Sequence, residues 1–481
     1  MAVQFVELIS SRFPMQPTEQ QDAALRRLAD FLIDRGAKES GCFVLKGYAG
    51  TGKTTIISAL VASLPALRMR SVLLAPTGRA AKVMSSYARK KAFTIHKKIY
   101  RKKVALSPDM VFGLADNPHT DTLFIVDEAS MISNERHTFN GRSVLEDLIQ
   151  YVASGERCRL LFVGDTAQLP PVGLLQSPAL DGQGLSLQFG LQALIYELTD
   201  VVRQEKDSGI LYNATAIRQQ IQAATGKSTD ELLPFPRFTV KGYPDIYRMT
   251  GEHLIEGLHY AYDKYGMENT IVICRSNKNA NLYNQHIRNR ILFREEELTG
   301  GDYIMVVRNN YFWLAAESER AGFIANGDMA QVRRVRNVHE QHGFRFADVS
   351  LEFIDSDEIE PIDCRVMLDT LHTDSANLPQ GDQQRLFEAV MADYEDITDK
   401  KERLVALKAD PYYNALQIKF AMAVTCHKAQ GGQWQAVFVD QGYMTEERLD
   451  VEFLRWLYTA CTRATDELFL VNFHEKFFNQ L

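Results

Sequence analysis

A glycine-rich segment that ends in lysine and threonine carries the clearest chemistry of the sequence. The segment Gly47-Tyr48-Ala49-Gly50-Thr51-Gly52-Lys53-Thr54 has the spacing GxxxxGKT, follows an apolar run at 42–46 and precedes a helical pattern at 56–63. In such a loop the backbone N–H groups close around phosphate oxygens, the lysine reaches the β- and γ-phosphates, and the threonine hydroxyl binds Mg²⁺. The sequence therefore predicts a P-loop for a nucleoside triphosphate. We expect its contacts from Gly47, Ala49, Gly50, Thr51, Gly52, Lys53, Thr54 and Thr55, with Lys53 also catalytic and Thr54 also a metal ligand.

Two carboxylates follow the apolar run at 123–126, about seventy residues after the P-loop. Asp127 is placed to bind the magnesium shell, and Glu128 to orient or deprotonate the attacking water. An Asp-Glu pair at a strand end is more often solvated charge or a helix cap. With a P-loop upstream, we favour the catalytic interpretation.

A third apolar run, at 161–163, ends in Gly164 and Asp165 and is followed by the loop 166–172. In this loop Gln168 is positioned so that its amide could touch both the γ-phosphate and a bound strand. A plain turn with a rigid proline loop explains the same residues equally well. We carry Gln168 forward as a candidate catalytic residue.

Length and charge limit the class of protein. The chain has 481 residues, of which 46% are hydrophobic and 24% charged, so we expect three or more packed units of ordinary globular composition. The formal net charge of −7 means that any nucleic-acid contact must come from a local basic groove. No apolar run is long enough for a membrane span and the start lacks a secretory pattern, so we expect a cytoplasmic protein without a membrane partner. Its six cysteines form no CxxC pair, which gives no indication of a zinc or iron–sulfur site.

Apolar strands alternate with amphipathic helices in two stretches, the pattern of a parallel sheet covered on both faces. We expect α/β folding with a first unit at 1–202, a second unit split into 203–299 and 419–481, and an insertion at 300–418. The insertion begins with short alternating segments at 303–307, 330–335 and 345–353, which predict a small antiparallel barrel, and continues with a helical, acidic stretch at 383–407.

Seven sequence blocks, taken in order, resemble superfamily 1 helicases of the 5′-to-3′ branch, which holds RecD-like proteins. The blocks are GYAGTGKT (47–54), APTGRAA (75–81), TIH (94–96), VDEAS (126–130), GDTAQLPPV (164–172), TCHKAQG (425–431) and YTACTRA (458–464). The resemblance implies two tandem RecA-like P-loop cores with an SH3-like β-barrel inserted into the second. It also implies ATP and Mg²⁺ as cofactors, single-stranded DNA and DNA junctions as partners, a monomeric motor, and a bacterial or phage-type setting.

The resemblance assigns further nucleotide contacts. Gln21 is similar to the glutamine that reads adenine, with the neighbouring Gln20 leaving the register open by one. Arg203 and Arg463 resemble the arginines that reach the γ-phosphate from across the cleft and neutralise charge during phosphoryl transfer. Gln430 and Gly431 are expected to link the strand-holding segment to the nucleotide.

Other blocks resemble the segments that hold the strand, which for a motor that ignores sequence means contacts to phosphates. These residues are Thr77, Arg79, Thr94, His96, Thr425, His427 and Lys428. A basic run at 97–103 lies where the family places a strand-separating pin, which we expect at about 97–121, although a solvated charged loop explains the run as well. The chain departs from the family pattern at Cys426, Cys461 and Gly432, and an exposed Cys426 beside the track would make activity redox-sensitive.

Three functions compete at this point. The favoured one is an autonomous ATP-dependent 5′-to-3′ DNA helicase. The second is a single-stranded DNA translocase that removes bound proteins, or the motor subunit of a RecD-type nuclease complex. The third is a P-loop ATPase switch without nucleic acid, whose hydrolysis rate a DNA strand would not change.

Overall fold

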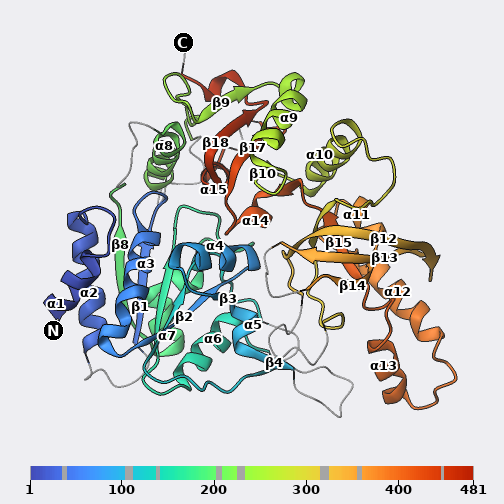
Figure 1. Ribbon diagram of the computed structural model, residues 1–481, viewed down its shortest axis with the longest axis horizontal. Coiled ribbons are helices and arrows are strands. Elements are labelled where there is room, and N and C mark those ends of the chain that lie inside the picture. The colour runs from blue at the N-terminus through green and yellow to red at the C-terminus, as the bar shows by residue number, and fades with distance from the viewer. Residues whose placement is uncertain are drawn as a thin grey trace.

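The computed structural model describes residues 2–34, 41–102, 112–136, 141–201, 208–224, 233–314, 324–354, 360–445 and 449–479. Two sheets with helices on their faces form the left and upper parts of the molecule, and a barrel with further helices forms the right part (Figure 1). We call the unit around the first sheet the first core and the unit around the second sheet the second core.

The first core is built on a six-stranded sheet in which every neighbouring pair runs parallel, in the order β3-β2-β6-β7-β1-β8. The strands are β1 (Gly41–Gly47), β2 (Arg70–Ala75), β3 (Ala92–Thr94), β6 (Thr122–Val126), β7 (Arg159–Gly164) and β8 (Gln192–Leu198). The helices are α1 (Ala2–Ser10), α2 (Glu19–Ile33), α3 (Lys53–Ser63), α4 (Gly78–Ala88), α5 (Ile95–Ile99), α6 (Val144–Ala153) and α7 (Gly182–Phe189). The central strands are apolar along their length because two separate hydrophobic clusters cover the two faces of the sheet.

The second core is a five-stranded parallel sheet in the order β16-β10-β17-β18-β9. Its strands are β9 (Ile246–Met249), β10 (Thr270–Cys274), β16 (Ala423–Thr425), β17 (Trp434–Asp440) and β18 (Ala464–Val471). Its helices are α8 (Gly209–Ala224), α9 (Leu254–Tyr265), α10 (Asn277–Arg290), α14 (Cys426–Ala429) and α15 (Val451–Cys461). The chain leaves this core after α10 and returns at β16, which is how two distant segments share one sheet (Figure 1).

The segment between them forms a closed barrel, β11-β12-β13-β14-β15. Its strands are β11 (Tyr303–Val306), β12 (Met329–Gln341), β13 (Phe344–Phe353), β14 (Ile362–Met367) and β15 (Leu416–Phe420). The expected antiparallel pairing holds except at closure, where β14 and β15 run parallel. They can do so because a long connection holding α11 (Asp369–His372), α12 (Gln380–Ala392) and α13 (Lys400–Lys408) separates them in sequence. Phe344 and Phe346 of the barrel pack with Leu386, Val390 and Leu407 of this connection.

The expected α/β fold class, two tandem RecA-like cores with a barrel inserted into the second, is confirmed. The domain boundaries stay predictions. β15 runs to Phe420, so the predicted boundary between 418 and 419 falls inside a barrel strand. The core strands β3, β8, β9 and β16 were not among the runs singled out from the sequence. β3 and β16 have three residues each and β9 four, and β8 is largely exposed at the sheet edge, so none of them shows the long apolar run of a buried strand.

The predicted pin region starts as a two-stranded hairpin of β4 (Tyr100–Lys102) and β5 (Phe112–Leu114), in which Arg101 faces Gly113. Residues 103–111 between these strands lie outside the described residues. None of the helices in the described ranges combines the length and the apolar character that crossing a membrane requires.

Candidate functional site

The P-loop connects β1 to α3 at the carboxyl edge of the first sheet. Gly50 has a φ of +79° and Gly52, which precedes the first residue of α3, a φ of +86°. Only glycine adopts these angles without strain, so both positions fix the path of the loop. A side chain at Gly47 would also collide with Thr51, whose Oγ1 lies 2.7 Å from the position of a Cβ. The glycine spacing of the sequence thus corresponds to a tight loop that ends at the start of α3.

Lys53 is held inside this loop. Its Nζ donates to the carbonyl oxygens of Gly47 at 2.7 Å and Tyr48 at 2.8 Å. Thr51 Oγ1 donates to the same Tyr48 oxygen at 2.9 Å. The Lys53 charge therefore sits at the centre of the loop, where a phosphate chain would bind. The side chain of Thr54, at the start of α3, is exposed.

Asp127 follows β6 directly, in the middle of the sheet. Its Oδ2 accepts the Tyr87 hydroxyl of α4 at 2.6 Å, and its Oδ1 accepts the Glu128 backbone N–H at 2.8 Å. Burial, together with the charge of Glu128, raises the pKa of Asp127 to about 6, and the positive charge of Lys53 opposes this rise. A carboxylate oriented by two donors, with the Thr54 hydroxyl as the other predicted ligand, is an oxygen donor set that fits Mg²⁺.

Glu128 adopts a φ of +51°, in the left-handed region that costs a non-glycine residue about 1–3 kcal/mol. This backbone turn directs the residue toward the second core, where the guanidinium of Arg463 lies 3.7 Å from Glu128 Oε1. Gln168 lies between the two. With its amide oriented to satisfy both neighbours, its nitrogen donates to Glu128 Oε2 at 3.3 Å and its oxygen accepts from Arg463 Nη2 at 3.2 Å. Three predicted catalytic residues thus meet in one place.

Arg463 is only 4% exposed although it carries a charge. Its position follows from the end of α15, where Nε donates to the Thr459 carbonyl at 3.1 Å and Nη1 donates to the Gly432 carbonyl at 3.2 Å. These bonds fix the guanidinium between its own core and Glu128. The other predicted cross-cleft arginine, Arg203, lies outside the described residues.

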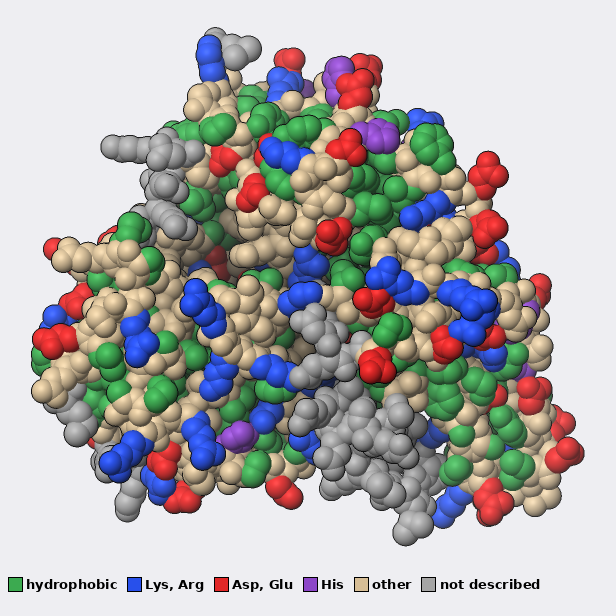
Figure 2. Space-filling model, viewed as in Figure 1, with side chains coloured by type: hydrophobic (Ala, Val, Ile, Leu, Met, Phe, Trp, Pro, Cys, Tyr) green, Lys and Arg blue, Asp and Glu red, His purple; other side chains and the backbone are tan. Residues whose placement is uncertain are grey.

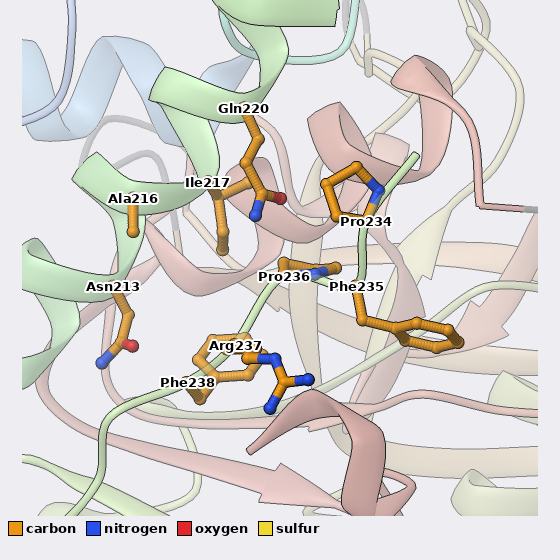
Figure 3. A pocket seen from close by; sticks show the side chains of 9 residues that line it. All are labelled: Asn213, Ala216, Ile217, Gln220, Pro234, Phe235, Pro236, Arg237 and Phe238. Carbon is orange, nitrogen blue, oxygen red and sulfur yellow. The ribbon is translucent and has the colours of Figure 1, made fainter. Parts of the chain in front are cut away.

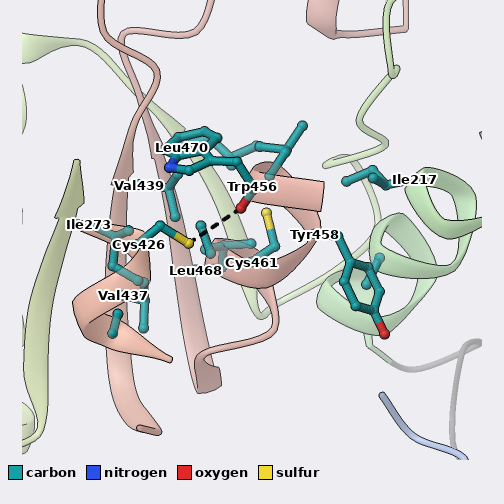
Figure 4. Close-up of a cluster of buried hydrophobic side chains, with 14 of the residues drawn as sticks. Ile217, Ile273, Cys426, Val437, Val439, Trp456, Tyr458, Cys461, Leu468 and Leu470 are labelled. Carbon is teal, nitrogen blue, oxygen red and sulfur yellow. Dashed lines mark hydrogen bonds between the residues drawn. The ribbon is translucent and has the colours of Figure 1, made fainter. Parts of the chain in front are cut away.

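A second chain of hydrogen bonds joins the cores next to this cluster. The hydroxyl of Tyr458, on α15, donates to Asp165 Oδ2 at 2.7 Å and accepts the backbone N–H of Ala49 at 2.8 Å. Figure 4 shows the Tyr458 ring beside Ile217, with its hydroxyl directed away from the hydrophobic cluster of the second core. Burial raises the pKa of Asp165, and the Tyr458 hydroxyl opposes that rise.

Gln430 and Gly431 lie at the seam between the cores and contact residues of the first core, and their predicted link to the nucleotide stays a prediction. Gln430 Nε2 donates to the Leu169 carbonyl at 2.7 Å, while the Leu169 N–H donates to Thr459 Oγ1 at 2.9 Å. Gly431 has a φ of +73°, and a Cβ there would lie 2.8 Å from Ala80 Cβ of α4. Two segments of the second core thus bond to the first-core loop that carries Gln168.

The departure from the family pattern at Gly432 has a packing explanation. A Cβ at this position would lie 2.3 Å from the Trp434 ring. The same ring also contacts Arg79 of the first core, whose guanidinium lies 4.6 Å from the ring centroid and donates to the Gln433 carbonyl at 3.1 Å. The predicted strand residue Arg79 is therefore engaged between the two cores.

The predicted adenine residue Gln21 is buried and bonded within the protein. Its Oε1 accepts the Thr18 N–H at 3.0 Å in a capping box that starts α2, and its Nε2 donates to the Thr51 carbonyl of the P-loop at 3.1 Å. Gln20 instead bonds Thr199 and Asp200. Of these neighbouring glutamines, Gln21 is the one in contact with the P-loop.

The residues predicted to contact the DNA strand, which we call the strand-side residues, lie at the starts of helices in both cores. Thr77 and Thr94 cap α4 and α5 by accepting the N–H groups of Ala80 and Lys97, both at 3.2 Å, and His96 lies in the first turn of α5 beside the Tyr100 ring. Thr425 and His427 lie at the start of α14. Lys428 reaches the barrel, where its Nζ donates to Asn326 Oδ1 at 2.5 Å. Basic side chains are frequent on the central part of this face, where α4, α14 and the barrel meet (Figure 2).

Burial lowers the pKa of Lys428 to about 8 and also lowers that of His427. The condition for redox sensitivity at Cys426 is not met, because its side chain is 1% exposed and its Sγ faces the Trp456 carbonyl at 3.5 Å (Figure 4). Burial raises the pKa of Cys426 to about 12, so its thiol is neither accessible nor ionised at neutral pH.

A cavity of about 300 Å³ lies apart from this cluster, between α8 and the segment 234–238 (Figure 3). Its lining includes Gln220 and Arg237, and none of its residues is a predicted site residue. This cavity therefore has no part in the site around Lys53, Glu128 and Arg463.

Two family descriptions match the chain. Residues 17–231 match the AAA domain, and residues 420–471 match the UvrD-like helicase C-terminal domain. Together they cover more than half of the chain and contain the P-loop and Arg463. The chain belongs to the superfamily 1 helicases. This family membership also confirms the expected enzyme class, an ATP-dependent helicase.

Relatives of this helicase occur among curated proteins. An uncharacterized protein of Acanthamoeba polyphaga mimivirus is 23% identical over 516 residues, which cover 94% of this chain and 98% of that protein. The ATP-dependent RecD2 DNA helicase of Deinococcus radiodurans is 33% identical over 201 residues, which cover 41% of this chain and 23% of that protein. The second similarity thus concerns only a part of each protein.

Among solved structures, a Pif1 helicase from Bacteroides in complex with ADP-AlF3 and ssDNA aligns over 97% of this chain and 95% of that chain, with 16% identity and a TM-score of 0.45. The Pif1 helicase from Candida albicans aligns over 97% of both chains, with 13% identity and a TM-score of 0.43.

Sequence reasoning missed the tyrosines of this helicase site. Tyr458 lies within the block YTACTRA, but the resemblance assigned a role only to Arg463. Tyr87 lies outside all seven blocks and reaches Asp127 because α4 packs against β2, the neighbour of β6 in the sheet. A buried tyrosine hydroxyl usually has a partner, so its presence in a motif block was the available signal.

Proposed function

We propose that this superfamily 1 helicase hydrolyses ATP with Mg²⁺, moves 5′ to 3′ along single-stranded DNA and unwinds duplex DNA at junctions. The observation that carries the proposal is the contact of Arg463 in the second core with Glu128 in the first, next to the P-loop. Hydrolysis at such a site depends on how the cores approach each other, which couples the chemistry to movement. The name of the Deinococcus radiodurans relative, a DNA helicase, supports DNA as the track.

We assign each residue of the site a separate role in phosphoryl transfer. Lys53 and the loop N–H groups hold the phosphate chain, and Thr54 and Asp127 hold Mg²⁺, which neutralises phosphate charge when bound. Glu128 positions the attacking water and accepts its proton. Arg463 stabilises the charge that develops on the transferred group, an effect of about 10³ to 10⁵ in rate in related NTPases. Gln168 bonds both Glu128 and Arg463, so its loop couples the water site to the second core.

The strand-side residues lie on both cores: Thr77, Arg79, Thr94 and His96 on the first, and Thr425, His427 and Lys428 on the second. Hydroxyl, amide and basic groups of this kind contact phosphates without reading sequence. Closure of the cores around the nucleotide would shift the two sets relative to each other by about one nucleotide, and release would reset them. We further propose that the motor acts as a monomer in a bacterial or phage-type cytoplasm.

Unwinding of matched forked, 5′-tailed and 3′-tailed DNA duplexes in the presence of ATP and Mg²⁺ tests activity and polarity together. We expect strand separation on the forked and 5′-tailed substrates and none on the 3′-tailed one. Preference for the 3′ tail would contradict the proposed polarity. Strand-stimulated hydrolysis without separation of any duplex would contradict unwinding and support a translocase.

A further inference from the structure

The Tyr458 hydroxyl bonds the Ala49 N–H of the P-loop, and the consequence of this bond rests on the proposed binding of ATP by that loop. A backbone N–H has a single proton to donate. In this conformation the Ala49 proton goes to Tyr458 Oη, at 2.8 Å. Ala49 lies within the loop whose N–H groups are expected to close around phosphate oxygens. The tyrosine and a bound phosphate therefore compete for the same donor.

The hydroxyl is held firmly in this position. Tyr458 and Asp165 are each 1% exposed, and the hydroxyl proton is donated to Asp165 Oδ2 at 2.7 Å. A hydrogen bond to a buried carboxylate is stronger than one between neutral groups. The second oxygen of Asp165 accepts the Ala167 N–H at 2.8 Å. Asp165 thus orients the hydroxyl so that its free lone pairs face Ala49.

The preceding P-loop residue is also held from the second core. The Tyr48 hydroxyl accepts Gln222 Nε2 of α8 at 2.8 Å and donates to Glu197 Oε1 at 2.9 Å. The Arg218 guanidinium of α8 lies 4.5 Å from the centroid of the Tyr48 ring. Two consecutive P-loop residues are therefore tied to two helices of the second core, α8 and α15.

We propose that Tyr458 is a positioning residue that sets nucleotide affinity: phosphate displaces its hydroxyl from the Ala49 N–H, and this exchange signals nucleotide occupancy to α15. The signal has a short path. Thr459, the next residue, accepts the Leu169 N–H of the loop that carries Gln168, and its carbonyl accepts Arg463 Nε. Release of Tyr458 therefore reaches the two side chains that face Glu128.

The variant Tyr458→Phe keeps the buried ring and removes only the competing hydroxyl. We expect it to bind ADP and a non-hydrolysable ATP analogue more tightly than the wild type, by about three- to tenfold, since one hydrogen bond no longer opposes binding. We also expect oligo-dT to change nucleotide affinity less than in the wild type, because the hydrogen bond that couples α15 to the P-loop is gone. Isothermal calorimetry measures both effects.

The matched control is Tyr262→Phe, in which the hydroxyl removed is buried in the second core and has no hydrogen-bond partner among the residues that the structure describes. We expect its nucleotide affinity to equal that of the wild type. A purely structural role for Tyr458 would lower the melting temperature and leave affinity unchanged or weaker. Unchanged or weaker binding by folded Tyr458→Phe therefore overturns the inference.

The second variant, Asp165→Asn, keeps the side-chain size but weakens the acceptor that orients the hydroxyl. We expect tighter nucleotide binding here too, by a smaller factor. If Tyr458→Phe does not fold, Asp165→Asn decides alone, and unchanged or weaker binding by it overturns the inference. A wild type that binds no nucleotide would instead overturn the proposed function, so the two failures are distinct.

Discussion

Arg463 and Glu128 lie 3.7 Å apart, guanidinium to carboxylate, although 335 positions separate them in the chain and they belong to different sheets. Glu128 reaches this point through a left-handed backbone turn after β6, and Arg463 through bonds to its own helix and to Gly432. The site is therefore complete only when both cores contribute. Hydrolysis that requires both cores is the physical basis of the proposed motor.

Arg463→Ala should lower kcat for ATP hydrolysis by about 10³-fold or more while changing nucleotide affinity only a few-fold, because the charge it stabilises develops in the transition state. Steady-state kinetics together with nucleotide binding separates the two effects. Arg157→Ala, which removes an exposed arginine paired with Asp121 on the first core, serves as the control and should leave both unchanged. An equal loss of turnover and of affinity would contradict a transition-state role.

Lys53→Ala should abolish hydrolysis and leave binding of single-stranded DNA largely intact. Lys53 is bonded to the carbonyl oxygens of the P-loop, and the strand-side residues do not depend on those bonds. ATPase assays with oligo-dT and fluorescence anisotropy of a labelled strand measure the two properties. Substantial residual turnover would be incompatible with the P-loop assignment.

Strand binding should weaken between pH 7 and pH 9. Burial lowers the pKa of Lys428, a predicted strand contact, to about 8. This lysine is mostly charged below that pH and mostly neutral above it, so its phosphate contact is lost as pH rises. The slope of log affinity against log salt should shrink by about 0.7 when this one lysine is neutral.

Lys428→Arg provides the comparison for this pH effect, since an arginine stays charged throughout the range. Its binding should retain more of the salt dependence at pH 9 than the wild type does. Identical pH profiles for the two proteins would exclude Lys428 as the titrating contact.

Gly432→Ala should destabilise the protein by about 1–3 kcal/mol, because the added methyl would collide with the Trp434 ring. That ring also stacks on Arg79, so contact between the cores should weaken as well. Gly381→Ala is the control: nothing lies within 4 Å of a Cβ there, and alanine favours the helix α12. Urea denaturation of both variants checks this; equal midpoints would show that the ring moves aside freely.

Short sequence patterns predicted those elements of the fold whose conformation depends mainly on residues close in the chain. The P-loop glycines, the buried strands before Asp127 and Asp165 and the alternating barrel strands all have periodic or fixed-spacing signals that do not depend on the rest of the chain. The parallel closure of β14 on β15 has no such signal, because it follows from the long connection that separates the two strands. The burial of Cys426 under Trp456 depends on how α14 meets α15, which spacing does not encode.

The candidate site also contains residues that sequence motifs predicted and contacts that they did not. Lys53, Asp127 and Glu128 follow directly from motifs on one sheet. Gln168 was a candidate from its loop and Arg463 only from resemblance. The bond between them was not predicted, since nothing in the sequence near either residue shows that the two cores face each other. The bonds of Tyr458 to Ala49 and Asp165 had no sequence signal beyond a buried tyrosine in a motif, because they join three distant segments.

The most direct test of the account is the rate of ATP hydrolysis by the wild-type protein with and without oligo-dT. Because Arg463 and the strand-side segment 425–428 belong to the same core, a bound strand should favour the closed arrangement and raise the rate at least tenfold. A rate that the strand leaves unchanged would contradict the coupled motor and support an ATPase switch that acts without nucleic acid.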